Sequence, residues 1–303
     1  MTSSMAAIAH DFPPFLRVFT DGRVQRLITI PHLPPSTDPL TGIRSKDVVI
    51  SPEFGIKSRI FLPKMSPQQK LPLIIYVHGG AFCFGSPLNV VTQSFLTPLV
   101  SQTSAVAIAI GYRLAPEHPL PAAYHDCWAA LQWIASHVSG AGPDPWINNY
   151  VDTSRVFLVG DSAGANLVHY LAVQAGVNHT RLGLGVRGLM VLHPYFIQKE
   201  PDELTRYLYP GCSGSDDDPK LNPAWDPDLG KLCTSRVLVA VAEKDFLKAR
   251  GVEYYETLKK SKWEGTIEFV ENEDEDHIFY LLNPSSEKAK ALFQHLISFI
   301  KQN

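Results

Sequence analysis

The sequence lacks the features that would take it out of the class of ordinary globular domains. Its 303 residues carry 27 Lys and Arg against 30 Asp and Glu, a net charge of −3, which gives no basic surface for nucleic acid. No apolar run approaches the roughly 20 residues of a membrane-spanning helix. The opening residues, MTSSMAAIAHDFPPF, show no basic stretch followed by a long apolar one. We therefore expect no nucleic-acid partner, no membrane span and no secretory signal.

Cysteine is scarce, and its spacing is uninformative for metal binding. The four residues Cys83, Cys127, Cys212 and Cys233 form no C-x-x-C pair and no metal-ligand pattern. We interpret them as free thiols of a reducing compartment and expect a cytoplasmic protein.

Internal repeats and low-complexity linkers are also absent, and from residue 71 onward buried strands alternate with helical stretches. We predict strands at 71–78, 105–113, 155–162, 187–195, 236–245 and 266–272. A helix is predicted after Pro121, and another over SEKAKALFQHLISFIKQ near the end of the chain. This alternation predicts an α/β fold with a mostly parallel sheet covered by helices on both faces. Sites in such sheets form beyond the carboxyl ends of the strands.

Two regions depart from the alternation. The first 65 residues resemble a meander, with a hairpin at Asp21-Gly22 that the stretches KDVVIS and IKSRIFLP extend. Residues 196–232 are long, polar and rich in Pro and Gly. Because this segment follows a strand, we expect it to lie above the carboxyl edge of the sheet as a functional cover or a flexible insertion.

A serine stands between two glycines where a predicted strand runs into a predicted helix. In RVFLVGDSAGANLVHY the residues Gly160 to Gly164 form G-x-S-x-G around Ser162. The pentapeptide alone is a weak signal, and a small-residue turn with a helix-capping serine is the competing interpretation. The strand before it and the helix after it favour a nucleophile elbow, with the hydroxyl exposed above the sheet.

A nucleophilic serine needs a base that follows it in the chain. His277 comes after the last predicted strand and fits that position. His78 and His193 end strands outside the required place, and His295 is expected on the apolar face of the last helix.

The base needs an acid that orients it, just after a strand that lies between serine and histidine in the chain. Asp245 ends the run RVLVAVAEKD. Glu243 is the alternative, but it stands two residues earlier and is expected still to be in the strand.

Acyl transfer also needs donors for the developing oxyanion, each of which contributes on the order of 3 kcal/mol. His78, Gly79, Gly80 and Ala81 follow the first buried strand, and the glycines let consecutive N–H groups turn inward. The N–H of Ala163 completes the predicted oxyanion hole.

Three motifs together carry a resemblance that covers nearly the whole chain: HGGAF, GYRLAPEHPLPAAYHDCWAALQW and GDSAGAN. They resemble the plant carboxylesterases of the hormone-sensitive-lipase branch of the α/β hydrolases. The resemblance implies Ser162 as nucleophile, His277 as general base, Asp245 as its orienter and Gly79–Ala81 as the oxyanion turn. It also implies one domain over residues 1–303, with 1–40 and 196–232 contributing to a substrate cover, and no metal or cofactor. The expected partner is a small ester or plant metabolite.

The sequence departs from this family at two places. Ala81 stands where family esterases carry a third glycine, and alanine keeps the N–H donor if its φ is not positive. Its methyl group is expected to narrow the acyl pocket. The segment 196–232 also looks shorter than in typical members, which would reshape the cover. Phe82, Phe84 and Leu88 follow the turn and are expected either in the core or in the pocket lining.

Other activities occur on the same scaffold, so alternatives stay open. A gibberellin receptor of this family has lost the triad histidine, whereas His277 is present here. A 2-hydroxyisoflavanone dehydratase carries threonine in the oxyanion turn, whereas Ala81 has no hydroxyl. A cyclase or eliminase of alkaloid-type metabolism, using the triad remnants as acid and base, is the main alternative to ester hydrolysis. The sequence does not define the oligomeric state.

Overall fold

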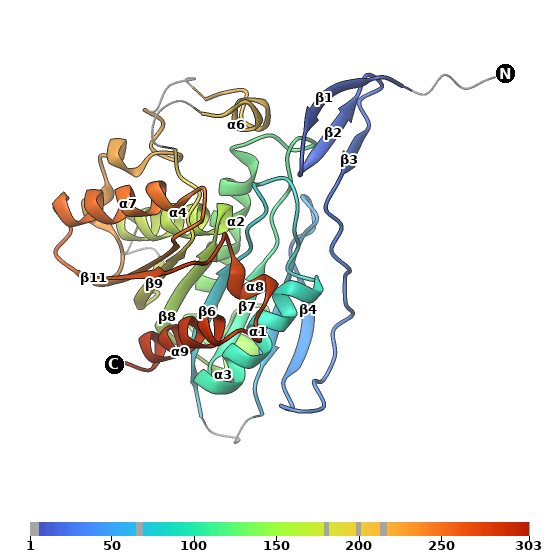
Figure 1. Ribbon diagram of the computed structural model, residues 1–303. Coiled ribbons are helices and arrows are strands. Elements are labelled where there is room, and N and C mark those ends of the chain that lie inside the picture. The colour runs from blue at the N-terminus through green and yellow to red at the C-terminus, as the bar shows by residue number, and fades with distance from the viewer. Residues whose placement is uncertain (1–5, 65–68, 179–181, 198–200, 213–216, 303) are drawn as a thin grey trace.

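The computed structural model describes residues 6–64, 69–178, 182–197, 201–212 and 217–302. Within these residues an eight-stranded sheet runs in the order β11-β10-β9-β8-β6-β7-β5-β4 (Figure 1). Its strands are β4 (Arg44–Ser51), β5 (Ile56–Leu62), β6 (Leu71–Val77), β7 (Val106–Ile110), β8 (Val151–Asp161), β9 (Val186–Leu192), β10 (Arg236–Ala242) and β11 (Thr266–Asn272). The strands from β6 to β11 are the six predicted ones, and they pair in parallel. The predicted α/β fold class is confirmed.

Several predicted strands end earlier than the apolar pattern indicated. β7 stops at Ile110, β9 at Leu192 and β10 at Ala242. After β7 and β9 the next residues remain buried, Tyr112 and Tyr195 among them, because loops rather than strand neighbours cover them. After β10 the chain is exposed at Glu243 and Lys244 and buried again at Asp245. The apolar pattern therefore reports burial, while the chain has already left the sheet to form the loops at its carboxyl edge.

Helices cover both faces of the sheet, as predicted. Alternate residues of β6 point to opposite layers: Leu73 and Ile75 belong to one core and Ile74 and Tyr76 to the other. The first core contains α2 (Ala122–Ala135), α3 (Pro145–Tyr150), α4 (Ala163–Val177) and α7 (Lys248–Lys260). The second contains α1 (Val90–Thr103), α8 (Phe279–Leu282) and α9 (Glu287–Lys301).

The last helix begins where its capping serine indicates, since Ser286 accepts a hydrogen bond from the N–H of Ala289. One detail of its expected apolar face is wrong. His295 is only half-buried and lies 3.1 Å from a carboxylate oxygen of Glu268, because its ring reaches the edge strand β11 rather than the core. No helix in the described part of the chain is long and apolar enough to cross a lipid bilayer, and all four cysteines are free.

A separate antiparallel sheet near the N-terminus consists of β1 (Ile8–Phe12), β2 (Leu16–Phe19) and β3 (Val24–Arg26). The predicted hairpin is present, with Gly22 at a φ of 82°. The expectation that KDVVIS and IKSRIFLP extend this meander was wrong. They form β4 and β5, and β5 pairs antiparallel with β7. Because β5 is buried on both faces, it needs a layer on each side that only the large sheet provides.

The small sheet packs against α6 (Glu203–Leu208) at one end of the molecule (Figure 1). Their shared apolar cluster contains Phe12, Leu16, Val18, Cys83, Ala115 and Leu208. The rest of the segment after β9 holds two short 3-10 helices, Pro223–Trp225 and Leu229–Lys231. Two stretches of it, 198–200 and 213–216, lie outside the described residues.

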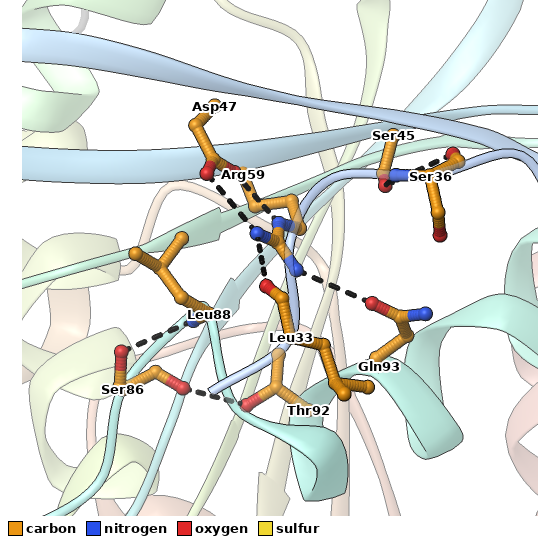
Figure 2. Close-up of polar contacts among 9 residues, drawn as sticks. All are labelled: Leu33, Ser36, Ser45, Asp47, Arg59, Ser86, Leu88, Thr92 and Gln93. Atoms are coloured by element: carbon orange, nitrogen blue, oxygen red, sulfur yellow. Dashed lines mark hydrogen bonds and ion pairs between the residues drawn. The ribbon is translucent and has the colours of Figure 1, made fainter. Parts of the chain in front are cut away.

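A buried arginine ties the connection between the two sheets to the main body (Figure 2). Arg59 on β5 is 1% exposed. Its guanidinium donates at 2.7 and 3.0 Å to both carboxylate oxygens of Asp47, at 2.8 Å to the carbonyl of Leu33 and at 3.2 Å to Gln93. Strand β4, the connection and helix α1 are therefore held by one side chain.

We expect Arg59→Leu to lower the free energy of unfolding by about 3 kcal/mol, because it leaves a half-buried carboxylate and a carbonyl without donors. Chemical denaturation followed by circular dichroism measures this loss. Arg23→Leu is the matched control, since Arg23 and Asp21 are both more than half exposed and 3.9 Å apart. That change should cost less than about 1 kcal/mol. Equal losses in the two variants would show that the buried contacts of Arg59 stabilise the fold no more than an exposed ion pair does.

Candidate active site

The turn between β8 and α4 holds Ser162 in a strained backbone conformation. Its φ is 52° and its ψ is −120°, a region that residues with a Cβ atom rarely adopt. The two flanking glycines allow this turn. A Cβ atom at Gly160 would lie 2.3 Å from the carbonyl of Gly164, and one at Gly164 would lie 2.0 Å from the carbonyl of Val77. Helix α4 therefore starts directly against strands β6 and β8.

The structure brings Ser162, His277 and Asp245 together from three separate loops. Nε2 of His277 lies 3.0 Å from Oγ of Ser162, and Nδ1 of His277 lies 2.8 Å from Oδ2 of Asp245. The Asp245 side chain is fully buried, and that of His277 is 19% exposed. These contacts allow a proton to pass from the hydroxyl to the imidazole while the carboxylate fixes the ring.

Asp245 is held as a carboxylate by its neighbours. Burial by itself raises the pKa of this carboxyl, but the hydrogen bonds with the ring of His277 and with the N–H of Leu247 more than offset burial, so the pKa lies well below its usual range. The alternative acid, Glu243, is exposed and accepts a hydrogen bond from the N–H of Asp274 at 2.7 Å. Among the contacts of the described residues, Glu243 has none with His277.

The N–H groups of the four predicted oxyanion-hole residues differ in their hydrogen bonding. That of Gly79 donates to Oδ2 of Asp161 at 3.1 Å, so it serves the turn rather than a substrate. Within the described part of the chain, the N–H groups of Gly80, Ala81 and Ala163 donate to no protein acceptor. These three groups therefore remain the candidate donors of the predicted oxyanion hole.

The condition set for Ala81 from the sequence was wrong, because its φ is positive and its N–H still has no acceptor among the described residues. Its φ is 48° and that of Phe82 is 59°, so both lie in the left-handed region, at a cost of roughly 1–2 kcal/mol per residue. The methyl group of Ala81 packs against the cluster shared by the small sheet and α6. Phe82 is a core residue, with Tyr195 and Tyr124 around its ring, whereas Phe84 is half-buried against Phe15.

Asp161 and Tyr76 hold the turn at Gly79 through hydrogen bonds, and neither residue was predicted from the sequence. The hydroxyl of Tyr76 donates to Oδ1 of Asp161 at 2.5 Å, while Oδ2 holds Gly79. The position of Asp161 beside the nucleophile was the only available signal, since Tyr76 looked like an ordinary strand residue. Burial raises the pKa of Asp161 to about 6.

The other histidines considered lie in different surroundings. His78 is buried with its ring stacked on Tyr112, its Nδ1 lies 2.7 Å from the carbonyl of Gly79, and burial lowers its pKa to about 4. The position of His193 was not expected from the sequence, because its Nδ1 lies 3.2 Å from Oδ2 of Asp245, the carboxylate that also contacts His277.

His193, Asp245 and His277 also form the one described group whose ligand atoms, all within 4.8 Å of one another, could surround a metal ion. The geometry does not suit one. Ligands of a tetrahedral zinc with bonds of about 2.1 Å lie roughly 3.4 Å apart. The 2.8 Å between His277 and Asp245 is instead a direct hydrogen bond.

Comparison with known proteins defines the family. The sequence profile of the α/β hydrolase fold matches residues 74–281. The chain belongs to this family. It is 42% identical to probable carboxylesterase 5 of Arabidopsis thaliana, over 97% of this chain and 98% of that relative. It is also 38% identical to the 2-hydroxyisoflavanone dehydratase of Glycyrrhiza echinata, over 99% of this chain and 98% of that relative.

Solved structures of esterases have the same fold as this α/β hydrolase. The hyperthermophilic esterase of Pyrobaculum calidifontis is 26% identical, with a TM-score of 0.69 over 85% of each chain. The thermostable carboxylesterase EstE1, from a metagenomic library, is 25% identical, with a TM-score of 0.71 over 90% of each chain. The resemblance to carboxylesterases that the motifs indicated is confirmed, and the chain is a carboxylesterase-like α/β hydrolase.

The raised pKa of Asp161 predicts a pH dependence of stability. Its carboxyl binds a proton more tightly in the folded protein than in the unfolded chain, so its contribution to stability falls as pH rises from about 4 to about 6. The shift corresponds to roughly 3 kcal/mol. Asp161→Asn removes this titration. The stability of the wild type relative to this variant should therefore fall by roughly 3 kcal/mol between about pH 4 and about pH 7. Urea titrations at both pH values measure the change, and a constant difference would contradict it.

Proposed function

We propose that the protein is a serine carboxylesterase that hydrolyses small carboxylic esters through an acyl-enzyme. The observation that carries the proposal is the continuous chain of contacts from Ser162 through His277 to Asp245, at 3.0 and 2.8 Å. The similarity to proteins named carboxylesterases, over almost the whole chain, supports the same activity.

In the first half of the reaction, Oγ of Ser162 attacks the ester carbonyl carbon while His277 Nε2 takes the hydroxyl proton. The negative charge that forms on the carbonyl oxygen is stabilised by the N–H groups of Gly80, Ala81 and Ala163. The tetrahedral intermediate then loses the alkoxide, which takes the proton from His277 and leaves as the alcohol. Ser162 remains esterified to the acyl group.

In the second half, a water molecule gives a proton to His277 and attacks the acyl carbon. The bond to Ser162 Oγ breaks, Oγ recovers the proton, and the carboxylic acid leaves. Asp245 stays ionised throughout, holds Nδ1 of His277 protonated and stabilises the imidazolium. No step needs a metal or a cofactor.

The small sheet and α6 form the proposed substrate cover, built from residues 1–40 and 196–232 of a single domain. Their shared cluster includes Cys83 and contacts Ala81 and Phe84 of the oxyanion turn, which supports this assignment. The guanidinium of Arg26 donates to the carbonyl of Cys83 at 2.7 Å and so joins the cover to the turn. The cytoplasmic location stays a prediction, and one relative is named mitochondrial.

Elimination or cyclisation on the same scaffold is the competing activity, and one similar protein is named a dehydratase. Ala81 argues against the dehydratase activity, because its side chain offers no hydroxyl. The short distance between Ser162 and His277 favours acyl transfer, since general acid–base chemistry alone does not need a serine hydroxyl held in a strained turn.

Purified protein should hydrolyse p-nitrophenyl acetate and butyrate, and the turnover should vanish in Ser162→Ala and His277→Ala. Spectrophotometric release of p-nitrophenol measures both. A folded wild-type protein without turnover would contradict ester hydrolysis and would direct attention to eliminase and cyclase substrates. Turnover that survives Ser162→Ala would overturn the acyl-enzyme mechanism.

Asp245→Asn should lower turnover by roughly four orders of magnitude while the fold persists, because the wrong tautomer of the base is then favoured. Glu243→Gln is the control two residues away and should leave turnover unchanged. A variant at position 243 that is as impaired as the one at 245 would reassign the acid.

A further inference from the structure

A second histidine lies behind the triad, on the side of Asp245 that faces the protein interior. His193 follows β9 and is 1% exposed. Its ring is surrounded by the rings of His277, Phe279 and Tyr280, with centroids 5.4 to 5.8 Å away. His193 therefore cannot meet a substrate, but it contacts the proposed general base, His277, and the acid that orients it, Asp245.

The backbone beside the general base bonds to this ring. The N–H of Ile278, the residue directly after His277, donates to Nδ1 of His193 at 3.1 Å. Nδ1 also lies 3.2 Å from Oδ2 of Asp245, but that contact lacks the geometry of a hydrogen bond, whereas the contact with Ile278 has it. The geometry therefore assigns the lone pair of the neutral ring to Nδ1 and the proton to Nε2. Burial lowers the pKa of His193, which keeps the ring neutral and Nδ1 available as an acceptor.

Ile278 is a residue that needs such a restraint. Its φ is 49° and its ψ is 29°, which places a β-branched side chain in the left-handed region, where it is a genuine outlier. A conformation of this kind persists only when the surroundings over-determine it. The partly buried hydrogen bond to His193 restrains the peptide between His277 and Ile278.

The buried His193 ring lowers the stability of the fold in a way that an apolar side chain at this position would avoid. Nε2 of His193 has no hydrogen-bond partner among the described residues. A buried donor without an acceptor costs about 1–3 kcal/mol, less where the face of a neighbouring ring accepts it weakly. His193 is itself at a φ of 47°. An apolar side chain would remove the unpaired donor, but it would also release the N–H of Ile278.

We propose that His193 is a positioning residue of the site: its Nδ1 holds the N–H of Ile278 and thereby sets the place of His277 between Ser162 and Asp245. This inference rests on the proposed function, since it concerns how the general base of that reaction is held. Reaction rates fall by about 100-fold when a reacting group is displaced by about 1 Å, which sets the scale of the expected effect.

The test compares His193→Leu with His193→Asn. Leucine removes the acceptor, so kcat for p-nitrophenyl butyrate should fall by about 100-fold, with KM unchanged because residue 193 does not face the substrate. Asparagine places Oδ1 where Nδ1 was, because both atoms are two bonds from Cβ, and it should restore most of kcat. Equal losses in the two variants would show that ring packing matters and the hydrogen bond does not.

His169 supplies a matched control. It is also fully buried, with an unpaired Nε2, but its Nδ1 bonds to the hydroxyl of Tyr254 on helix α7 at 3.0 Å. His169→Leu should leave kcat unchanged, whatever it does to the melting temperature. If His169→Leu and His193→Leu lower kcat alike, a general loss of stability explains the effect and the proposal fails.

A spectroscopic measurement covers the case in which the leucine variant does not fold. In wild-type protein labelled with 15N-histidine, Nδ1 of residue 193 should resonate as an unprotonated acceptor and Nε2 as a protonated nitrogen. A protonated Nδ1 would overturn the proposal. Failure of the proposed function gives a different result, because the wild type would then have no turnover or Ser162→Ala would retain it. If Ser162→Ala is inactive and His193→Leu has wild-type kcat, only the role of His193 is wrong.

Discussion

The site depends on the close approach of helix α4 to strands β6 and β8. Gly160 and Gly164 leave no room for a Cβ atom between helix and strands, so the chain turns sharply and Ser162 is forced to a φ of 52°. This single turn sets the direction of the serine hydroxyl, and it leaves the first N–H of α4, that of Ala163, without an acceptor among the described residues. Every other group of the site is arranged around the position that this turn defines.

The strain is not confined to the serine. Ala81, Phe82, His193 and Ile278 also have positive φ values, and all of them lie in loops beyond the carboxyl ends of β6, β9 and β11. Strained residues persist where the surrounding structure over-determines them. Here the restraints are buried or partly buried hydrogen bonds, from Tyr76 to Asp161, from Gly79 to Asp161 and from Ile278 to His193. The packed core of the sheet and helices stabilises the fold, and this stability offsets the strain of the loops at the carboxyl edge.

The sequence predicted the parts of this arrangement that follow from local patterns. Short apolar runs bounded by helices predict buried parallel strands, and glycines around Ser162 predict an elbow because few other residues fit such a turn. The order of Asp245 and His277 followed from the same architecture, and the structure brings both to Ser162. The single-domain boundary and the roles of these residues stay predictions that experiments must test.

What the sequence did not predict depends on contacts between distant segments. β4 and β5 follow the N-terminal hairpin in the chain, so the sequence indicated that they extend it. In the structure β5 pairs with β7 instead, and both strands belong to the large sheet. Tyr76 and His193 look like strand residues until the fold sets them beside Asp161 and Asp245. The φ of Ala81 could not be known either, because alanine adopts this conformation only where neighbouring structure compels it.

The central claim is that a covalent acyl group forms on Ser162, and mass spectrometry tests it most directly. Protein mixed with p-nitrophenyl butyrate, quenched in acid within the first turnovers and digested, should yield the peptide around Ser162 with the mass of one butyryl group added. Steady hydrolysis with no adduct on that peptide, or with the acyl group on another residue, would contradict the account.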